Sequence, residues 1–288
     1  MTHGKASRQA REVPLAHDRV KRRLLSADDA FLRAIGIADA NGRVLPSMQG
    51  KFTQVDGFLR IIEQVVDEND LARGPVTVVD CGCGSASLTF AAWHYLNDIR
   101  GIPASACGVD TSDELIRKCS DLRDSLGWKT LEFRASSIAD FVPASPPDIV
   151  LSLHACDTAT DEAVAKGVLW QSRVILAAPC CQHELHRKIR APLFQPMLRH
   201  GVLRERLADL LTDTFRALVL RIMGYRTRVI EFVSPEHTSK NLMIRAERHL
   251  KPGDPAAVSE YQALKTWWSV EPVIQGMLGD AIRPYLTP

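Results

Sequence analysis

Residues 78–88, VVDCGCGSASL, join an apolar run to a turn that contains Gly82 and Gly84. The run VTVVD at residues 76–80 has the length and composition of a buried strand, and residues 86–97 have those of a helix. The two glycines permit backbone conformations that other residues avoid, and they let the main chain approach a ligand closely. The stretch therefore predicts a strand, a glycine turn and a helix that together form a ligand site.

The glycine turn lacks the features of a phosphate-binding loop. Ser87 stands where the dinucleotide fingerprint has its third glycine, and no Gly-Lys-Ser/Thr sequence follows, which excludes a P-loop. Asp110 ends the next apolar run, ACGVD, and a carboxylate there can accept hydrogen bonds from both hydroxyls of a ribose. A glycine turn and a ribose-binding acid without a pyrophosphate site indicate a nucleoside that carries no phosphate. S-adenosylmethionine has this chemistry.

Apolar runs of strand length alternate with helical segments after residue 75, which predicts an α/β protein whose parallel sheet is covered on both faces. The helical segment 191–223 is interrupted at His200-Gly201, and two late strands with a short link predict an antiparallel edge hairpin. The seven strands are expected at residues 76–80, 106–110, 130–135, 148–153, 173–178, 225–233 and 241–249. The helices between the first five are expected at residues 86–97, 113–126 and 161–168.

Helical spacing also precedes the sheet. Residues 15–35 alternate charged and apolar positions, and the sequence SADD from Ser26 could begin a helix there. Residues 54–66 place apolar side chains on one helical face. We therefore expect three parts: a basic and helical extension at 1–50, a core at 51–250, and a tail at 251–288 that packs on the core.

The composition is that of an ordinary globular chain, with 288 residues, 45% hydrophobic and 24% charged, and a net charge of +2. No apolar run is long enough to span a membrane, and the first residues lack the apolar core of a signal peptide. The seven cysteines do not form the pattern of a disulfide framework. We therefore expect a cytoplasmic protein without a membrane partner, whose oligomeric state the sequence does not indicate.

This arrangement resembles the class I S-adenosylmethionine-dependent methyltransferases over residues 50–250. Their first motif, acid-x-Gly-x-Gly, matches Asp80, Gly82 and Gly84, and the acid of their second strand matches Asp110. The resemblance implies a Rossmann-like fold, S-adenosylmethionine as the cofactor, and adenine contacts just after the third strand. The cofactor-binding residues that we expect are Lys51, Asp80, Cys81, Gly82, Gly84, Ser85, Asp110, Ser137, Ile138 and Leu153. Lys51 and Gln54, which precede the core, could reach the cofactor carboxylate or the substrate, and Lys51 could equally be solvated.

A narrower resemblance rests on four stretches. They are MQGKFTQVD (48–56), LHACDTATD (153–161), PCCQHEL (179–185) and HTSKNLMIRA (237–246). Together they look like a methyltransferase-like group with a Cys-Cys-Gln-His segment, which is related to tRNA ribose 2′-O-methyltransferases. Asp157 replaces a glycine of the second stretch in those enzymes, and Gln182 alters the third.

The narrower resemblance implies an RNA acceptor. A basic arm at residues 1–23 could contact phosphate, or it could be a solvated and partly disordered terminus. Two alternatives stay open. The acceptor could be a protein side chain or a small molecule, because the net charge is close to neutral. The chain could also be a non-catalytic module that binds the cofactor.

The expected catalytic residues are His154, Cys180, Cys181 and His183. His154 could accept a proton from the acceptor, since the pKa of histidine lies near working pH, or it could only shape the pocket. The cysteines are similar in place to those of RNA 5-methylcytosine enzymes, in which a thiolate attacks the base.

Neighbouring polar residues have competing interpretations. His183 and Glu184 could bind substrate or begin a helix. Asp157 is expected to cap the helix that follows, and Asp161 to be solvated or to orient His154. We expect no metal, because adjacent cysteines span a tetrahedral site poorly.

Overall fold

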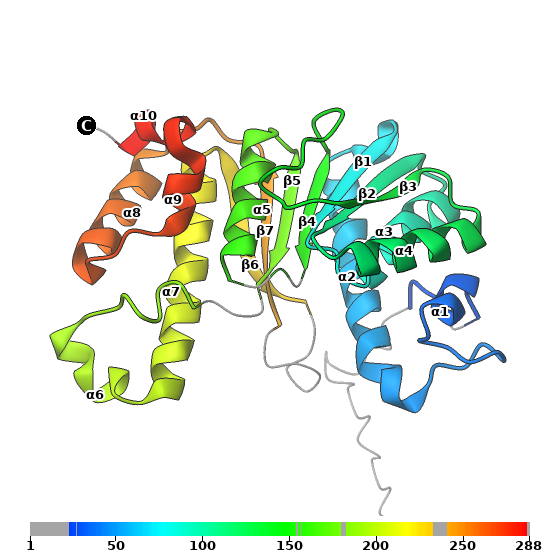
Figure 1. The fold of residues 1–288 in the computed structure, drawn as a ribbon. Coiled ribbons are helices and arrows are strands. Elements are labelled where there is room, and N and C mark those ends of the chain that lie inside the picture. Colours follow the sequence, from blue (N-terminus) through cyan, green and yellow to red (C-terminus); the bar gives the residue numbers. More distant parts are fainter. Residues whose placement is uncertain are drawn as a thin grey trace, which may run out of the picture.

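The computed structural model describes residues 23–26, 28–153, 155, 157–179, 183–232 and 241–286. Within them, one seven-stranded sheet has the order β3-β2-β1-β4-β5-β7-β6 (Figure 1). Its strands are β1 Val76–Cys81, β2 Ala104–Asp110, β3 Leu131–Ala135, β4 Ile149–Leu153, β5 Val174–Ala178, β6 Tyr225–Glu231 and β7 Leu242–Arg248. β7 is antiparallel to both of its neighbours, and the pairs from β3 to β5 are parallel. The predicted Rossmann-like sheet with an antiparallel edge hairpin is confirmed.

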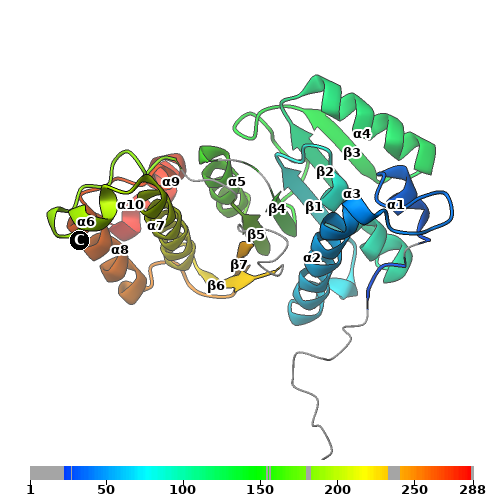
Figure 2. The same ribbon diagram turned by 90° about the horizontal axis from the view of Figure 1, so that it is seen from below.

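Two hydrophobic clusters hold helices against the sheet. One cluster joins α2, α3 and α4 to one face, and the other joins α5, α7, α8 and α9 to the opposite face. Figures 1 and 2 place α1–α4 toward the β1–β3 end of the sheet and α6–α10 toward the β6–β7 end. The helices are α1 Ala30–Ala34, α2 Gln49–Glu68, α3 Ser87–His94, α4 Asp113–Leu126, α5 Thr158–Leu169, α6 Gln195–Leu198, α7 Gly201–Ile222, α8 Pro255–Trp268, α9 Val273–Leu278 and α10 Arg283–Leu286. No helix among the described residues combines the length and the apolar character needed to cross a membrane.

Strand β1 divides its side chains between the two layers. Val76 and Val78 belong to the cluster of α2 and α3, whereas Val79 and Cys81 belong to the cluster of α5. This division follows from the alternation of side chains along a strand. The same alternation directs Asp80 toward α2.

The N-terminal helix is shorter than the sequence predicts. Of the segment 15–35, residues 15–22 and 27 lie outside the described residues, and α1 covers only Ala30–Ala34. Before α1, the Oδ2 atom of Asp29 accepts a hydrogen bond from the backbone N–H of Ser26 at 3.0 Å. Such side-chain bonds to the backbone favour turns over helices, so the spacing before Ala30 does not extend the helix.

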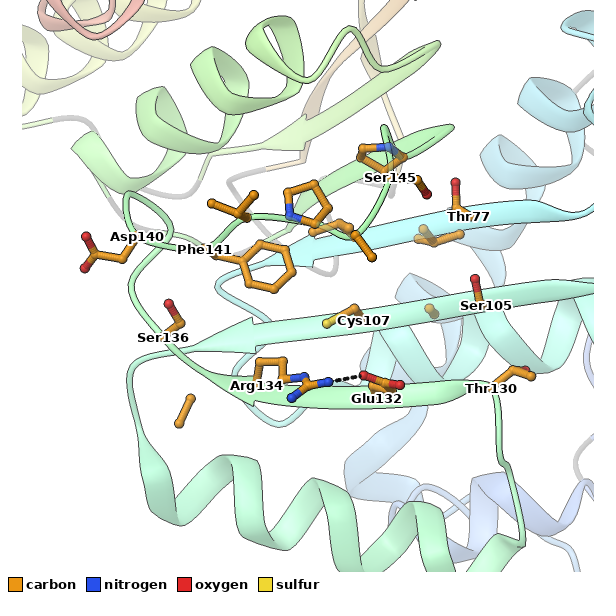
Figure 3. Close-up of a pocket in the computed structure, with 18 of the residues that line it drawn as sticks. Thr77, Ser105, Cys107, Thr130, Glu132, Arg134, Ser136, Asp140, Phe141 and Ser145 are labelled. Carbon is orange, nitrogen blue, oxygen red and sulfur yellow. Dashed lines mark hydrogen bonds and ion pairs between the residues drawn. The ribbon is translucent and has the colours of Figure 1, made fainter.

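Among the described residues, one part of the sheet has no helix as its second layer. The connection between β3 and β4, residues 136–148, contains no helix. Ser105, Glu132 and Arg134 lie on the strands beneath it, and the loop and strands enclose a groove of about 710 Å³ (Figure 3). The expectation that helices cover both faces is wrong here, and the alternation of apolar and charged residues in LEFRA (131–135) is the signal for it.

Candidate functional site

The turn after β1 contains three residues in the left-handed region: Gly82 at φ +75°, Gly84 at φ +54° and Ala86 at φ +55°. The backbone N–H of Gly82 donates to the carbonyl oxygen of Val109 at 2.8 Å, which ties the turn to β2. A Cβ atom on Gly82 would lie 3.1 Å from the Cβ of Ala155 in the loop after β4. Glycine at this position therefore satisfies both the backbone conformation and the close approach of two loops.

Asp110 at the end of β2 holds the same turn. Its Oδ2 accepts a hydrogen bond from the N–H of Gly84 at 2.9 Å, and its Oδ1 accepts one from the N–H of Ser112 at 2.9 Å. Each carboxylate oxygen has two acceptor sites, so one site on each remains for the ribose hydroxyls. The ribose contact of Asp110 stays a prediction, and the structure adds that this carboxylate shapes the glycine turn.

A cavity of about 250 Å³ lies between the turn and α2. The helix α2 contributes three lining residues at positions i, i+3 and i+4, which share one helical face. The carboxyl-terminal parts of β1 and β4 contribute one residue each. The lining residues are Lys51, Gln54, Val55, Asp80, Cys83, Ser85, Ser87, Leu88 and Leu153.

Lys51, Asp80, Ser85 and Leu153 are predicted cofactor residues that the structure brings together at this cavity. Gln54, the further candidate, and Cys83 of the glycine turn also line it, and three other lining residues are absent from the prediction. Helical spacing from Lys51 could have identified one of them, because residues four apart lie on the same face. The other two lie in the first turn of α3 beside the glycine turn. These three residues are Val55, Ser87 and Leu88.

Asp80 is the buried acid of the cavity, with 3% of its surface exposed. Its Oδ2 accepts a hydrogen bond from the Oγ1 of Thr89 at 2.5 Å, whereas its Oδ1 has no partner among the described residues. Burial raises the pKa of Asp80 to about 6, against the opposing effect of the bond from Thr89. A buried acceptor without a partner is rare in a folded protein. The ammonium group of S-adenosylmethionine would satisfy it, so these residues fit that cofactor.

The two cysteines of the turn face different layers. Cys83 lines the cavity, whereas Cys81 is buried on the α5 side with Val79 and Val109. Burial, reinforced by the charge of Asp80, raises the pKa of both thiols far above its usual range. Both side chains are therefore neutral at physiological pH, which suits packing rather than nucleophilic attack.

Ser137 and Ile138, predicted to flank adenine, follow β3 but do not line the cavity. The Oγ of Ser137 donates to the Oδ2 of Asp140 at 2.6 Å, and Ile138 is buried in the cluster of α5. Their contact with adenine stays a prediction.

Asp157 joins the loops that follow β4 and β5. Its Oδ1 accepts hydrogen bonds from the N–H groups of His183 at 2.9 Å and Glu184 at 3.1 Å. Its backbone has φ +53° and ψ −125°, a combination that favours glycine. Asp157 is the N-cap residue of α5, but its side chain makes no capping bond, so the predicted capping role is wrong.

The remaining catalytic predictions divide into two groups. His183 is exposed, and the residues after it form turns rather than a helix. The other three predicted residues, His154, Cys180 and Cys181, lie outside the described residues. Their roles stay predictions.

A buried ionic group lies beneath the loop of Asp157. Arg216 of α7, with 1% of its surface exposed, donates to the two carboxylate oxygens of Asp161 at 2.8 and 2.7 Å. It also donates to the Oδ1 of Asp213 at 3.0 Å and to the carbonyl oxygen of Asp157 at 3.1 Å. The predicted solvated position of Asp161 is therefore wrong, since it is 2% exposed. The guanidinium connects α5 to α7 and holds the main chain of the loop.

Comparison with known families gives one match. Residues 50–188 match a family model described as a methyltransferase domain. This range contains α2, the glycine turn, Asp110, and the loops after β4 and β5. A search of curated proteins finds no significant match.

Solved structures with a similar fold include three methyltransferases. Magnesium protoporphyrin IX methyltransferase from Synechocystis PCC 6803, with bound SAM, has 15% identity and a TM-score of 0.45, over 76% of this chain and 89% of that chain. The ribosomal protein L11 methylase from Lactobacillus delbrueckii subsp. bulgaricus has 13% identity and a TM-score of 0.41, over 71% and 80%. An rRNA methylase from Streptococcus thermophilus has 12% identity and a TM-score of 0.39, over 66% and 95%. These three differ in what they methylate, so the likeness does not decide the acceptor.

Proposed function

We propose that the methyl acceptor of this S-adenosylmethionine-dependent methyltransferase, whose residues 50–188 match a methyltransferase domain, is RNA. The cofactor supplies a methyl group that its sulfonium already activates. The protein must then align the acceptor with that group and take up one proton. Lys51, Asp80 and Asp110 would hold the cofactor, and the loops after β4 and β5 would hold the acceptor.

The observation that carries this proposal is a concentration of positive charge after β5. Residues 183–206 contain six arginines and lysines against two glutamates, which gives a net charge of +4, whereas the whole chain carries +2. The segment begins at His183, whose N–H is bonded to Asp157 of the loop after β4. The charge therefore starts at the edge of the sheet where ligands of such folds bind.

Several arginines of this segment have no acidic partner among the described residues. Arg187, Arg190 and Arg199 are exposed, and none of them forms an ion pair within the part of the chain that the structure describes. Arg221 of α7, in contrast, pairs with both Asp254 and Glu260, at 3.0 and 2.9 Å. A guanidinium without a carboxylate partner is available to phosphate oxygens, which supports a nucleic-acid acceptor.

The test is transfer of tritium from labelled S-adenosylmethionine into total RNA from cells that lack this protein. We expect acid-insoluble label that ribonuclease removes and protease leaves. The Asp80→Asn variant serves as the control for cofactor-dependent transfer. Label that survives ribonuclease and disappears with protease would show a protein acceptor and overturn the proposal.

A further inference from the structure

The basic segment after β5 carries an aromatic group. Phe194 meets Trp267 of α8 edge-on, with ring centroids 5.6 Å apart and an interplanar angle of 90°. Trp268 lies 4.6 Å from Trp267 and is buried, with 5% of its surface exposed. Trp267 itself remains 51% exposed. The half-buried ring of Phe194 and the buried ring of Trp268 thus pack against an indole whose exposed part is available for stacking.

The indole and the unpaired arginines belong to one region. The Nζ of Lys188 donates to the carbonyl oxygen of Glu271 at 3.4 Å, so the segment packs against the chain just after α8. Figure 1 shows this segment leaving the sheet and running to α6. Arg190 lies four residues before Phe194 in the sequence, and Arg199 lies five residues after it. We use the term α6 surface for Arg187, Arg190, Phe194, Arg199 and Trp267.

We propose that the α6 surface binds a single-stranded segment of the RNA beside the methylated nucleotide. A base stacks on Trp267, while Arg187, Arg190 and Arg199 contact the phosphates. Single strands expose the faces of their bases, whereas a duplex hides them inside the helix. The inference rests on the proposed function, because it assumes an RNA acceptor.

Chain connectivity relates the basic part of this surface to the loops that would hold the acceptor. Asp157 binds the N–H groups of His183 and Glu184, so the segment that carries Arg187, Arg190 and Arg199 begins directly after these loops. In the same stretch, Leu193 is 82% exposed, which adds an apolar contact for a base or ribose. Charge and stacking in one place are the combination that binds single-stranded nucleic acid.

Binding of a fluorescein-labelled oligouridine of about twenty nucleotides, followed by anisotropy, tests the proposal. We expect Trp267→Ala to weaken binding about 10-fold and Trp267→Phe to restore part of that loss. We expect the triple variant Arg187→Gln/Arg190→Gln/Arg199→Gln to reduce the slope of log affinity against log salt by about 2. Binding of S-adenosylhomocysteine, unchanged in each variant, verifies that the fold is intact.

A matched control removes the same charge elsewhere. Lys129 precedes β3 and Lys251 follows the antiparallel β7, so both lie at the opposite edge of the sheet, and Arg117 lies on α4. The variant Arg117→Gln/Lys129→Gln/Lys251→Gln should bind the oligonucleotide as the wild type does.

If the wild type binds RNA and the variants of the α6 surface bind it equally well, the α6 surface is not the binding site, and the proposal of an RNA acceptor is unaffected. If the wild type binds no RNA, the proposed function falls with it. Equal affinity for a duplex of the same length would contradict stacking on Trp267.

Discussion

Asp80 shows a conflict between stability and ligand binding at the level of one residue. Its carboxyl group is buried with one oxygen unpartnered, which lowers the stability of the charged form in the free protein. The same oxygen is what a cationic ligand needs. We infer that the fold retains a destabilising charge here because the bound cofactor compensates it.

The pKa of Asp80, raised to about 6 by burial, sets the sign of a pH dependence. A raised pKa in the folded state means that this group favours folding below its unfolded pKa and loses that contribution as pH rises through about 6. Asp80→Asn should therefore raise the unfolding free energy of the cofactor-free protein by up to about 3 kcal/mol at about pH 7.5. The gain should vanish near pH 4, which is about the unfolded pKa.

Urea denaturation at the two pH values measures this difference, and calorimetry with S-adenosylmethionine measures the accompanying loss of affinity. A variant that is less stable than the wild type at neutral pH would contradict the account of a strained charge.

The loops after β4 and β5 act as one element because of Asp157. Its side chain binds two N–H groups of the second loop, and Arg216 holds its own carbonyl oxygen from below. The backbone conformation of Asp157 suits glycine, so the carboxylate contacts compensate a strain of about 1–3 kcal/mol. A glycine at this position would adopt the backbone conformation without strain, but it would lack the side chain that connects the two loops.

Substitution of Asp157 separates these two effects. Asp157→Ala loses the hydrogen bonds and keeps the strain, so it should lower the unfolding free energy by about 2–4 kcal/mol. Asp157→Gly loses the same bonds but relieves the strain, and it should be more stable than the alanine variant by about 1–2 kcal/mol. Asp157→Asn keeps an acceptor oxygen and should be close to the wild type.

A regular helical position provides the control for Asp157. Asp121 is exposed in α4, where glycine should be less stable than alanine by about 1 kcal/mol. The glycine variant should therefore be more stable than the alanine variant at Asp157 and less stable than it at Asp121. The same order at both positions in urea denaturation would contradict the strain at Asp157.

The sequence predicts the fold well where local patterns alone determine the secondary structure. All seven strands and the interruption at His200 follow from apolar runs and breakers that tertiary contacts do not oppose. The glycine turn and its cavity follow from the order of motifs at strand ends, as Asp80 and Leu153 illustrate.

Features that depend on distant residues are not predictable in this way. The role of Asp157 depends on His183, 26 residues away, and the burial of Asp161 depends on Arg216, 55 residues away. An Asp before a helix looks like a cap in the sequence, because nothing local shows its backbone angle. The uncovered part of the sheet is an intermediate case, since the alternation in β3 indicates it.

At the scale of the molecule, β2 separates two unlike environments. Ser105 is exposed on the groove side, beneath a loop without a helix. Gly108 faces the other way, where a Cβ would lie 2.7 Å from the Cδ1 of Phe133 and 2.9 Å from the Sγ of Cys83. The groove side of the strand can therefore accept a larger side chain, whereas the other side is fully packed up to the cavity beside the glycine turn.

This contrast predicts opposite results for two substitutions on the same strand. Ser105→Tyr should change the unfolding free energy by less than about 1 kcal/mol and leave cofactor affinity unaltered, because the ring enters the groove. Gly108→Ala, although much smaller, should lower the unfolding free energy by about 1–3 kcal/mol and weaken cofactor binding through Cys83. Thermal melts and calorimetry check both. Tolerance of alanine at Gly108 would contradict the packing of this face.

The outermost strands of the sheet, β3 and β6, expose charged side chains. Glu132 and Arg134 of β3 form an ion pair of 2.8 Å, and Arg228 of β6 pairs with Glu68 at 2.8 Å. The outer rim of a terminal strand has free peptide groups to which a strand of another molecule could add. Ionic side chains on such a strand oppose that addition, because a second molecule would have to desolvate them. The pair on β3 thus opposes intermolecular sheet growth beside the connection 136–148, which contains no helix.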